Sequence, residues 1–159
     1  MQITSTTGVK PLEVSPPKRD RFGILIVDDE SEIREVLGDA LRGGSLVVHE
    51  ADSLEQANTI AGSERIDLAL VDLALPDGDG LWLARDWAER QPQIQTIVIT
   101  GKPSLQRAVE AIRAGAADFL AKPLDLEDLN RSVERAMQRR RDVIDRDERV
   151  GRLRHLCKQ

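Results

Sequence analysis

Cysteine, aromatic side chains and long apolar runs are all scarce in this sequence of 159 residues. The single cysteine, Cys157, excludes an intramolecular disulfide and is typical of a reducing compartment. No apolar run approaches the length of about 20 residues that a membrane-spanning helix needs, and the N-terminus lacks the form of a signal peptide. We therefore expect a cytoplasmic protein without membrane contact. Aromatic residues make up only 3%, so aliphatic side chains must fill its core.

The sequence also lacks an excess of basic residues. Its net charge is −5, from 28 acidic residues against 23 lysines and arginines. A surface that binds nucleic-acid phosphates needs the opposite balance, so we expect no direct nucleic-acid binding. The arginine-rich segment near the C-terminus contains interspersed acids and no aromatic residues for base stacking, which favours a charged, solvated helix face.

Three parts of the chain differ in composition and period. Residues 1–20 are rich in Thr, Ser and Pro without a sustained period, which predicts a flexible N-terminal tail. Residues 21–139 alternate apolar runs with segments of helical period, enough for one domain with a hydrophobic core. Residues 140–159 continue the last helical pattern as a C-terminal helical extension.

Residues 21–139 contain five short apolar runs that predict strands. The runs lie in the sequences FGILIVDDE, SLVVHEA, IDLALVDLALP, TIVIT and DFLAKP. A segment of helical spacing follows each run, and Ser53, Ser104 and Asp125 are predicted helix caps. This alternation predicts an α/β fold of the (βα)5 type. It is a doubly wound, five-stranded parallel sheet of flavodoxin-like form, with helices on both faces and an extended C-terminal helix.

Polar residues gather at the carboxyl ends of four predicted strands. Asp28 and Asp29 end the first strand, Asp72 the third, Thr100 the fourth and Lys122 the fifth. Ligands of such folds bind outside these strand ends, so we expect the five side chains to converge there. Each residue alone could be a solvated strand end or a helix-start charge, but the set on four strands favours a functional site.

The residue types of this set suit phosphoryl chemistry. Crowded carboxylates repel one another unless a cation is present, and hard oxygen ligands suit Mg²⁺. One carboxylate could then attack phosphorus, while Thr100 and Lys122 would stabilise the phosphoryl oxygens. Gly101 would leave room for the incoming group because it has no side chain.

Four sequence blocks within residues 22–138 together resemble the receiver domain of two-component response regulators, which is CheY-like. They are ILIVDDE, DLALPDGDG, VIT followed by glycine, and DFLAKP. The resemblance implies Mg²⁺ and the following roles: Asp72 as phosphoacceptor, Asp29 and the backbone carbonyl of Ala74 as metal ligands, Asp28 as a supporting acid, Thr100 as switch hydroxyl, Lys122 as phosphate partner, Phe119 as switch aromatic, and Pro123 after a cis peptide bond.

The resemblance also implies partners. The phosphoryl donor would be a histidine kinase or a phosphotransfer protein, and a downstream output protein or domain would read the switch. The switching surface would comprise the helix after Ser104, the strand DFLAKP and the last helix, and it could also form a homodimer.

Two positions bear on the lifetime of the phosphorylated state. Ala74 offers no polar side chain to position an attacking water, and Lys102 places a cation near the expected phosphoryl group. Our hypothesis is slow self-dephosphorylation.

Three other functions are less well supported by the sequence. Phosphatases and phosphotransferases with an aspartate nucleophile characteristically need a second acid two residues later, where this chain has Ala74. A nonphosphorylated interaction module of the same fold loses acidic or lysine residues that this chain retains. A nucleotide-binding protein would need a glycine-rich loop after the first strand, where VDDESE stands instead. The PDGDG segment is no EF-hand, because the twelfth position from Asp77 is Ala88.

The C-terminal extension allows two interpretations. Leu129, Ala136, Val143, Val150 and Cys157 recur every seven residues, which is typical of an imperfect coiled-coil seam. Arg140 and Asp147 interrupt the seam, and Gly151 weakens the helix. A parallel dimer helix and a solvated helix that frays after Arg141 both remain open.

Overall fold

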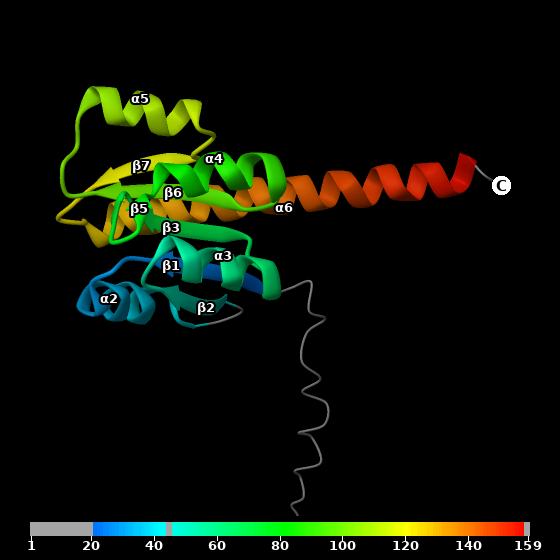
Figure 1. Cartoon of the computed structure of the whole chain (residues 1–159). Coiled ribbons are helices and arrows are strands. Elements are labelled where there is room, and N and C mark those ends of the chain that lie inside the picture. Colours follow the sequence, from blue (N-terminus) through cyan, green and yellow to red (C-terminus); the bar gives the residue numbers. More distant parts are fainter. Residues whose placement is uncertain (1–20, 44–45, 158–159) are drawn as a thin grey trace, which may run out of the picture.

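The structure, a computed structural model, describes residues 21–43 and 46–157; the predicted N-terminal tail lies outside them. The strands are β1 (Phe22–Val27), β2 (Leu46–Ala51), β3 (Leu68–Asp72), β4 (Ala74–Leu75), β5 (Gly78–Asp79), β6 (Gln95–Thr100) and β7 (Asp118–Ala121). The helices are α2 (Ser31–Leu41), α3 (Leu54–Ser63), α4 (Leu81–Arg90), α5 (Leu105–Arg113) and α6 (Leu126–Cys157). Strands and helices alternate along the chain as predicted (Figure 1).

Five parallel strands form the main sheet in the order β2-β1-β3-β6-β7. This confirms the predicted doubly wound, flavodoxin-like fold. The chain moves outward in opposite directions from β1 and β3, so the crevice between their carboxyl ends is the expected ligand site of the fold. β1 ends immediately before Asp28, and β3 ends in Asp72.

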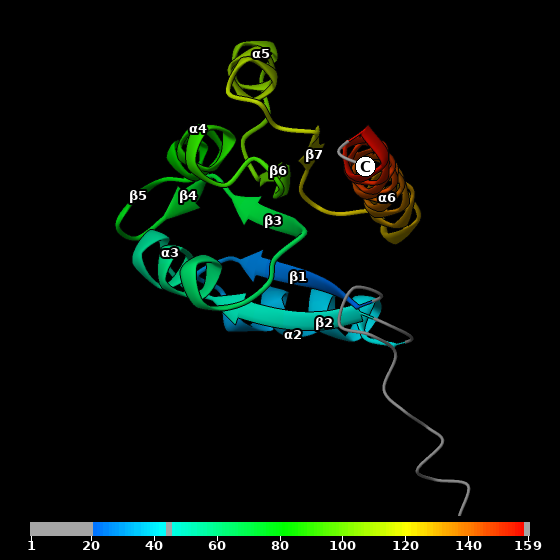
Figure 2. The same ribbon diagram turned by 90° about the vertical axis from the view of Figure 1, so that its right-hand side faces the viewer.

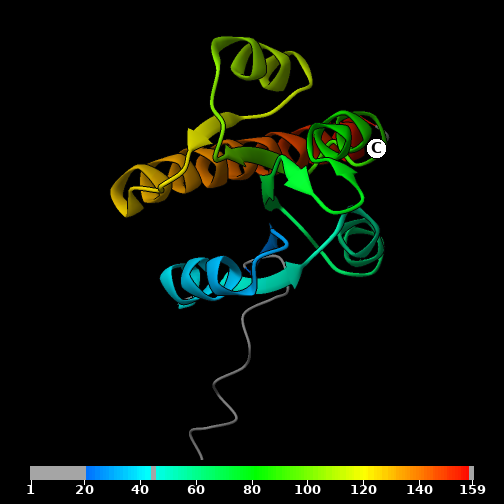
Figure 3. The same ribbon diagram turned by 60° about the vertical axis from the view of Figure 1, so that its left-hand side comes forward.

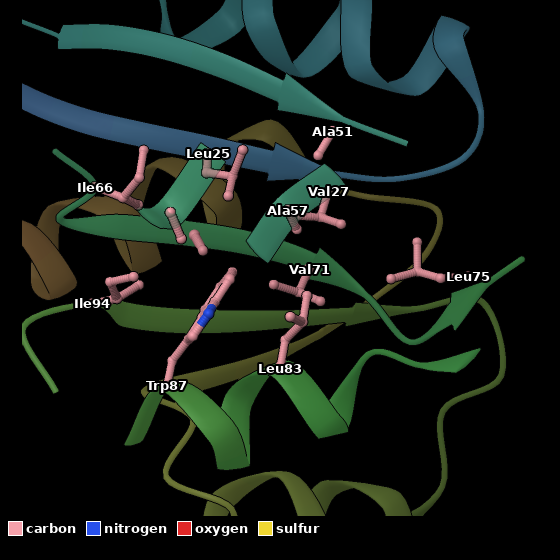
Figure 4. Packing of buried hydrophobic residues seen from close by; sticks show 12 residues of the cluster. Leu25, Val27, Ala51, Ala57, Ile66, Val71, Leu75, Leu83, Trp87 and Ile94 are labelled. Atoms are coloured by element: carbon pink, nitrogen blue, oxygen red, sulfur yellow. The ribbon is translucent and has the colours of Figure 1, made fainter. Parts of the chain in front are cut away.

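Helices cover both faces of the sheet. Figure 2 shows α2 and α6 on one face, and α3 and α4 on the other. Successive residues of the central strands point to opposite faces, so Leu25 and Val27 face one helical layer while Ile24 and Ile26 face the other. Trp87 of α4 inserts its ring into the first of these layers (Figure 4). Both faces of the sheet are therefore closed, which leaves the strand ends as its accessible polar rim.

The predicted helix caps at Ser53, Ser104 and Asp125 are confirmed. The hydroxyl of Ser53 accepts a hydrogen bond from the backbone N–H of Gln56, and that of Ser104 accepts one from Arg107. The carboxylate of Asp125 accepts from the N–H of Glu127. Each cap satisfies a backbone donor that the first helical turn leaves without a partner.

A short antiparallel hairpin, β4–β5, occupies the turn after β3 and was not predicted. Two-residue strands carry no readable period, so the sequence shows only a turn there. Farther along the chain, α5 stands at the β7 edge of the sheet, opposite the edge that carries α2 (Figure 3). Leu105, Val109 and Ile112 of α5 are exposed, and Ala111 is its buried contact.

Three consecutive arginines join α6 to the amino-terminal edge of the sheet. Nη1 of Arg139 donates to the carbonyl oxygen of Ala117, just before β7, at 3.4 Å. Nε of Arg140 donates to the carboxylate of Asp67, just before β3, at 3.1 Å. The guanidinium of Arg141 lies 5.1 Å from the ring centroid of Phe22 in β1.

Within this arginine triplet, residues 139–141, Arg140 departs from one sequence-based interpretation. We expected a charged, solvated face, and Arg139 and Arg141 are indeed exposed, but the Arg140 side chain is only 15% exposed and its acidic partner only 1%. The triplet therefore fixes α6 across three strand starts, and α6 continues as a helix to Cys157. None of the helices in the described part of the chain combines the length and apolar character that a bilayer-crossing segment requires.

Candidate functional site

Three aspartates meet at the carboxyl ends of β1 and β3. Asp28 and Asp72 are buried, with 3% and 6% of their surfaces exposed, whereas Asp29 is exposed. One carboxylate oxygen from each lies within 4.8 Å of the others. The sequence predicted this convergence, because adjacent parallel strands end at the same edge of the sheet.

Lys122 bridges the two buried carboxylates. Its ammonium nitrogen lies 2.9 Å from Oδ2 of Asp28 and 2.9 Å from Oδ2 of Asp72. Partial burial lowers the pKa of Lys122, but the hydrogen bonds to Asp72 and Asp28 outweigh this effect and raise the pKa above its ordinary value. Lys122 is therefore a permanent cation at neutral pH, held between an acid from each of two strands.

The second oxygen of each buried aspartate is oriented by its own loop. Oδ1 of Asp28 accepts from the N–H of Glu30 at 2.9 Å, and Oδ1 of Asp72 accepts from the N–H of Ala74 at 3.0 Å. Nη1 of Arg34 also donates to the carbonyl oxygen of Asp28 at 2.7 Å. These bonds hold both carboxylates with one face toward Lys122 before any ligand arrives.

The remaining predicted residues lie on the loops after β6 and β7. Thr100 is buried at the end of β6, where its hydroxyl accepts from the N–H of Lys102 at 3.0 Å. A Cβ added to Gly101 would meet no atom within 4 Å. The Lys122–Pro123 peptide bond is cis, the conformation that the resemblance implied.

Phe119 of β7 is half-buried and packs beneath α5 in a small core cluster with Leu81 and Val98. It lies beside Val98 in the sheet register, two residues before the strand position of Thr100. Phe119 and Thr100 therefore lie on neighbouring strands of the sheet.

The loop after Asp72 contains acids whose positions sequence reasoning did not predict. The Asp77 carboxylate caps α3 by accepting from the N–H groups of Leu54 and Glu55. Asp79 accepts two hydrogen bonds from Arg107 of α5 at 2.9 and 3.0 Å. Burial opposes ionisation of Asp79, but the Arg107 guanidinium and the N–H of Leu81 lower its pKa below the ordinary value. The contacts of Asp77 with α3 and of Asp79 with Arg107 join residues 22 or more apart in sequence, so spacing could not reveal them.

Gly80 is the other residue near the site that sequence reasoning missed. A Cβ at this position would lie 2.2 Å from the carbonyl oxygen of Asp72. Its N–H also donates to the carbonyl oxygen of Leu73 at 2.9 Å. The signal was present in the sequence as a glycine at the start of a helix, but only the packing shows that a side chain is excluded there.

The donor set at the three aspartates fits Mg²⁺. Carboxylate oxygens are the hard ligands this ion prefers, and an octahedral ion with bonds of about 2.1 Å separates its ligand atoms by about 3–4 Å. One oxygen each of Asp28, Asp29 and Asp72 lies within 4.8 Å of the others, and Lys122 contacts two of these three carboxylates. Asp29, the exposed member, leaves the site open to solvent.

Comparison with known proteins identifies the family. The family model of the response regulator receiver domain matches residues 24–134. The chain belongs to the response regulator receiver family. Receivers are signalling domains of two-component systems, and the aspartates, Thr100 and Lys122 all lie within the matched region.

Curated relatives support this assignment. The chain is 42% identical over 116 residues to the response regulator protein PilR of Pseudomonas aeruginosa, an alignment that covers 73% of this chain and 26% of PilR. It is 35% identical over 116 residues to the transcriptional regulatory protein KdpE of Escherichia coli, covering 73% of this chain and 51% of KdpE. The chain thus spans about a quarter to a half of the length of these relatives.

Solved structures resemble this receiver over its folded body. A CheY-like receiver domain from Methanospirillum hungatei matches with a TM-score of 0.72 and 28% identity, covering 77% of this chain and 98% of that one. The beryllofluoride-activated NtrC4 receiver domain dimer matches with a TM-score of 0.70 and 31% identity, covering 74% and 98%. A Burkholderia pseudomallei response regulator with a phosphorylated aspartic acid and a calcium ion gives 0.66 and 29%, covering 76% and 72%.

Proposed function

We propose that this receiver accepts a phosphoryl group on Asp72 from a histidine kinase or a phosphotransfer protein. The observation that carries the proposal is the Lys122 ammonium, which lies 2.9 Å from both Asp28 and Asp72 at the carboxyl edge of the sheet. It places a fixed positive charge beside the carboxylate of Asp72, whose other oxygen accepts from the N–H of Ala74. The phosphorylated aspartic acid of the similar Burkholderia protein supports the same chemistry.

In the proposed reaction, a carboxylate oxygen of Asp72 attacks phosphorus and forms an O–P bond while the P–N bond of a phosphohistidine donor breaks. The electron pair of that bond leaves with the imidazole. Lys122 would then pair with a phosphoryl oxygen, and the Thr100 hydroxyl would donate to another. The N–H that Ala74 donates to Asp72 keeps the carboxylate oriented during the attack.

Asp29, Asp72 and the backbone carbonyl of Ala74 would hold Mg²⁺, with Asp28 as a supporting acid. When bound, the ion supplies positive charge that offsets the carboxylates and the developing charge on the phosphoryl oxygens. Asp28 and Asp72 each already have one oxygen fixed by a loop N–H and the other by Lys122. The side chains of Asp28 and Asp72 are therefore held in place by the chain itself before a cation binds.

The output of the switch would be the surface of α5, β7 and α6. Thr100 would move toward the phosphoryl group and Phe119 would turn inward under α5. The exposed apolar residues Leu105, Val109 and Ile112 of α5 lie on this surface. Their exposure suits a surface that binds a downstream output protein or domain, or a second receiver, once its shape has changed.

Replacement of Asp72 by asparagine is expected to abolish phosphoryl uptake. The parent protein, incubated with Mg²⁺ and acetyl phosphate, should gain the mass of one phosphoryl group, whereas Asp72→Asn should gain none. Asp77→Asn, in the same loop but outside the aspartate cluster, is the matched control and should behave as the parent. Intact-mass spectrometry measures all three. A folded parent that takes up no phosphoryl group from either acetyl phosphate or a kinase would instead support a nonphosphorylated interaction module.

Introduction of a polar side chain at position 74 is expected to shorten the phosphorylated lifetime. Ala74 is exposed and follows Asp72 by two residues, so the Ala74→Asn side chain could orient a water molecule toward phosphorus. We expect loss of phosphate to accelerate about tenfold, which is less than a positioned general base contributes. The decay of the phosphorylated mass after donor removal provides the measurement, and Pro76→Ala serves as the control. Equal decay in parent and Ala74→Asn would contradict the slow-dephosphorylation hypothesis.

A further inference from the structure

Asp29 differs from the other two aspartates of the site in the way its side chain is held. Asp28 and Asp72 each accept hydrogen bonds from a loop N–H and from Lys122. Among the residues that the structure describes, no hydrogen bond or ion pair engages the carboxylate of Asp29, which is exposed. One of its oxygens nevertheless lies within 4.8 Å of an oxygen of each of the other two acids. The direction of this side chain therefore depends on the backbone that carries it.

The backbone at Asp29 is held by Arg34 of α2, the helix that packs on the β1–β2 side of the sheet (Figure 2). Nη1 of Arg34 donates to the carbonyl oxygen of Asp28 at 2.7 Å. Hydrogen bonds from an ionised donor are shorter and stronger than those between neutral groups. This carbonyl belongs to the peptide group that joins Asp28 to Asp29. Because a peptide group is planar, the position of its oxygen fixes the plane in which the nitrogen and Cα of Asp29 lie.

Arg34 is itself held by Glu50 of the edge strand β2. Nε of Arg34 lies 3.3 Å from Oε1 of Glu50, and the Arg34 side chain is only 18% exposed. Oε2 of Glu50 pairs with Nη2 of Arg42 at 3.3 Å. Glu50 thus lies between two arginines, and of these two only Arg34 hydrogen-bonds to the Asp28 carbonyl in the described structure. The planar fork of Arg34 connects β2 to the peptide group that precedes Asp29.

We propose that Arg34 is a positioning residue for Mg²⁺, because it holds the peptide group from which the Asp29 carboxylate extends toward the ion. This inference rests on the proposed role of Asp29 as a metal ligand. Arg34 acts through the backbone, so it needs no contact with the ion or with the phosphoryl donor. Residues that orient metal ligands in this indirect way typically change metal affinity by about 10–100-fold when they are replaced.

The charge of Arg34 and its hydrogen bond have opposite effects on the binding of a cation. A positive charge near the aspartates repels Mg²⁺, so removal of the charge alone would strengthen Mg²⁺ binding. The hydrogen bond preorganises Asp29, so removal of the bond would weaken Mg²⁺ binding. Since Glu50 already offsets the charge of Arg34, we expect the loss of positioning to dominate. The direction of the change in affinity therefore separates positioning from electrostatics.

Titration of the full chain with Mg²⁺ alone, followed by the shifts of its backbone amide NMR signals, tests the proposal. Arg34→Met should weaken Mg²⁺ binding about tenfold. Arg34→Lys keeps the charge but lacks the planar fork that reaches two acceptors, so it should also weaken binding. Arg42→Met is the matched control, because it removes a cation from Glu50 without a contact to Asp28. This control should bind Mg²⁺ as tightly as the parent or more tightly.

The same spectra show whether each variant is folded. A contact that only stabilised the fold would leave the Mg²⁺ affinity of the folded protein unchanged, so equal or tighter binding by folded Arg34→Met overturns the proposal. If Arg34→Met does not fold, Arg34→Lys decides, and binding equal to that of the parent overturns the proposal.

Failure of the proposed function gives a different result from failure of this inference. A parent that binds Mg²⁺ and takes up a phosphoryl group, beside an Arg34→Met variant of unchanged Mg²⁺ affinity, overturns only the role of Arg34. A folded parent that binds no Mg²⁺ overturns both the proposed metal site and the inference that rests on it.

Discussion

Replacement of Gly80 by alanine is expected to destabilise the protein by about 1–3 kcal/mol and to slow phosphoryl uptake. The added Cβ would lie 2.2 Å from the carbonyl oxygen of Asp72 and 2.9 Å from Cγ1 of Val71. Both neighbours belong to the buried strand β3 and have little room to move. Gly80 has helical backbone angles, φ −60° and ψ −22°, so the effect is steric rather than conformational. Relief of the clash must displace either α4 or the proposed phosphoacceptor.

Urea unfolding measures the stability change, and the rate of mass gain with acetyl phosphate measures the effect on Asp72. Gly62→Ala is the matched control, because Gly62 lies within α3 and a Cβ there meets nothing within 4 Å. That control should be as stable as the parent or more stable by up to about 1 kcal/mol. If Gly80→Ala were equally well tolerated, α4 could shift freely against β3, and the proposed tight support of Asp72 would be wrong.

Removal of the Asp67 carboxylate is expected to lower the free energy of unfolding by about 3–5 kcal/mol. Asp67 is 1% exposed and accepts hydrogen bonds from the N–H of Gly23 at 3.0 Å and from Nε of Arg140 at 3.1 Å. Nε of Arg65 pairs with it at 3.2 Å. Asp67→Ala would leave the half-buried Arg140 guanidinium and a buried backbone N–H without this acceptor. Buried donors that lose their acceptor destabilise the folded state more than the loss of the hydrogen bond alone.

A double-mutant cycle isolates the pair that holds α6. Asp67→Ala, Arg140→Met and the double variant should give a coupling free energy of about 1–3 kcal/mol by urea unfolding. Arg90→Met is the control, because Arg90 pairs with Asp86 on the surface of α4 and such exposed pairs contribute about 0–1 kcal/mol. Additive effects of the two single changes would mean that Arg140 does not fasten α6 through Asp67.

Most of the fold could be predicted from the spacing of apolar residues in the sequence. Short, β-branched apolar runs such as Ile24–Val27 are typical of strands buried on both faces, and the segments of helical spacing between them indicate crossover helices. The carboxyl edge followed from the same pattern, because parallel strands bring their ends together. Asp28, Asp72 and Lys122 could therefore be placed in one site, although 94 residues separate the first from the last.

Contacts between side chains of different elements were decided by the tertiary structure alone. The periodicity of a sequence does not report how two elements lie relative to each other. Asp77 and Asp79 look like turn residues in the sequence, yet one caps α3 and the other holds Arg107 of α5. In the sequence, Gly80 is only a glycine at the start of a helix. The structure shows that a Cβ at this position would clash with the carbonyl oxygen of Asp72. The spacing of residues in the sequence indicates which face of its own helix or strand a side chain occupies. The partners of Asp77, Asp79 and Gly80 depend instead on how different helices and strands pack together.

The arginine triplet shows the same division. The sequence indicated a basic, helical segment, and the structure agrees about the helix. Which charges are solvated depends on where the sheet ends beneath them, and three strand starts lie within reach of residues 139–141. Local sequence thus determined the helix, the strands and the polar rim. Packing decided which polar groups are buried together, because burial depends on distant parts of the chain meeting in space.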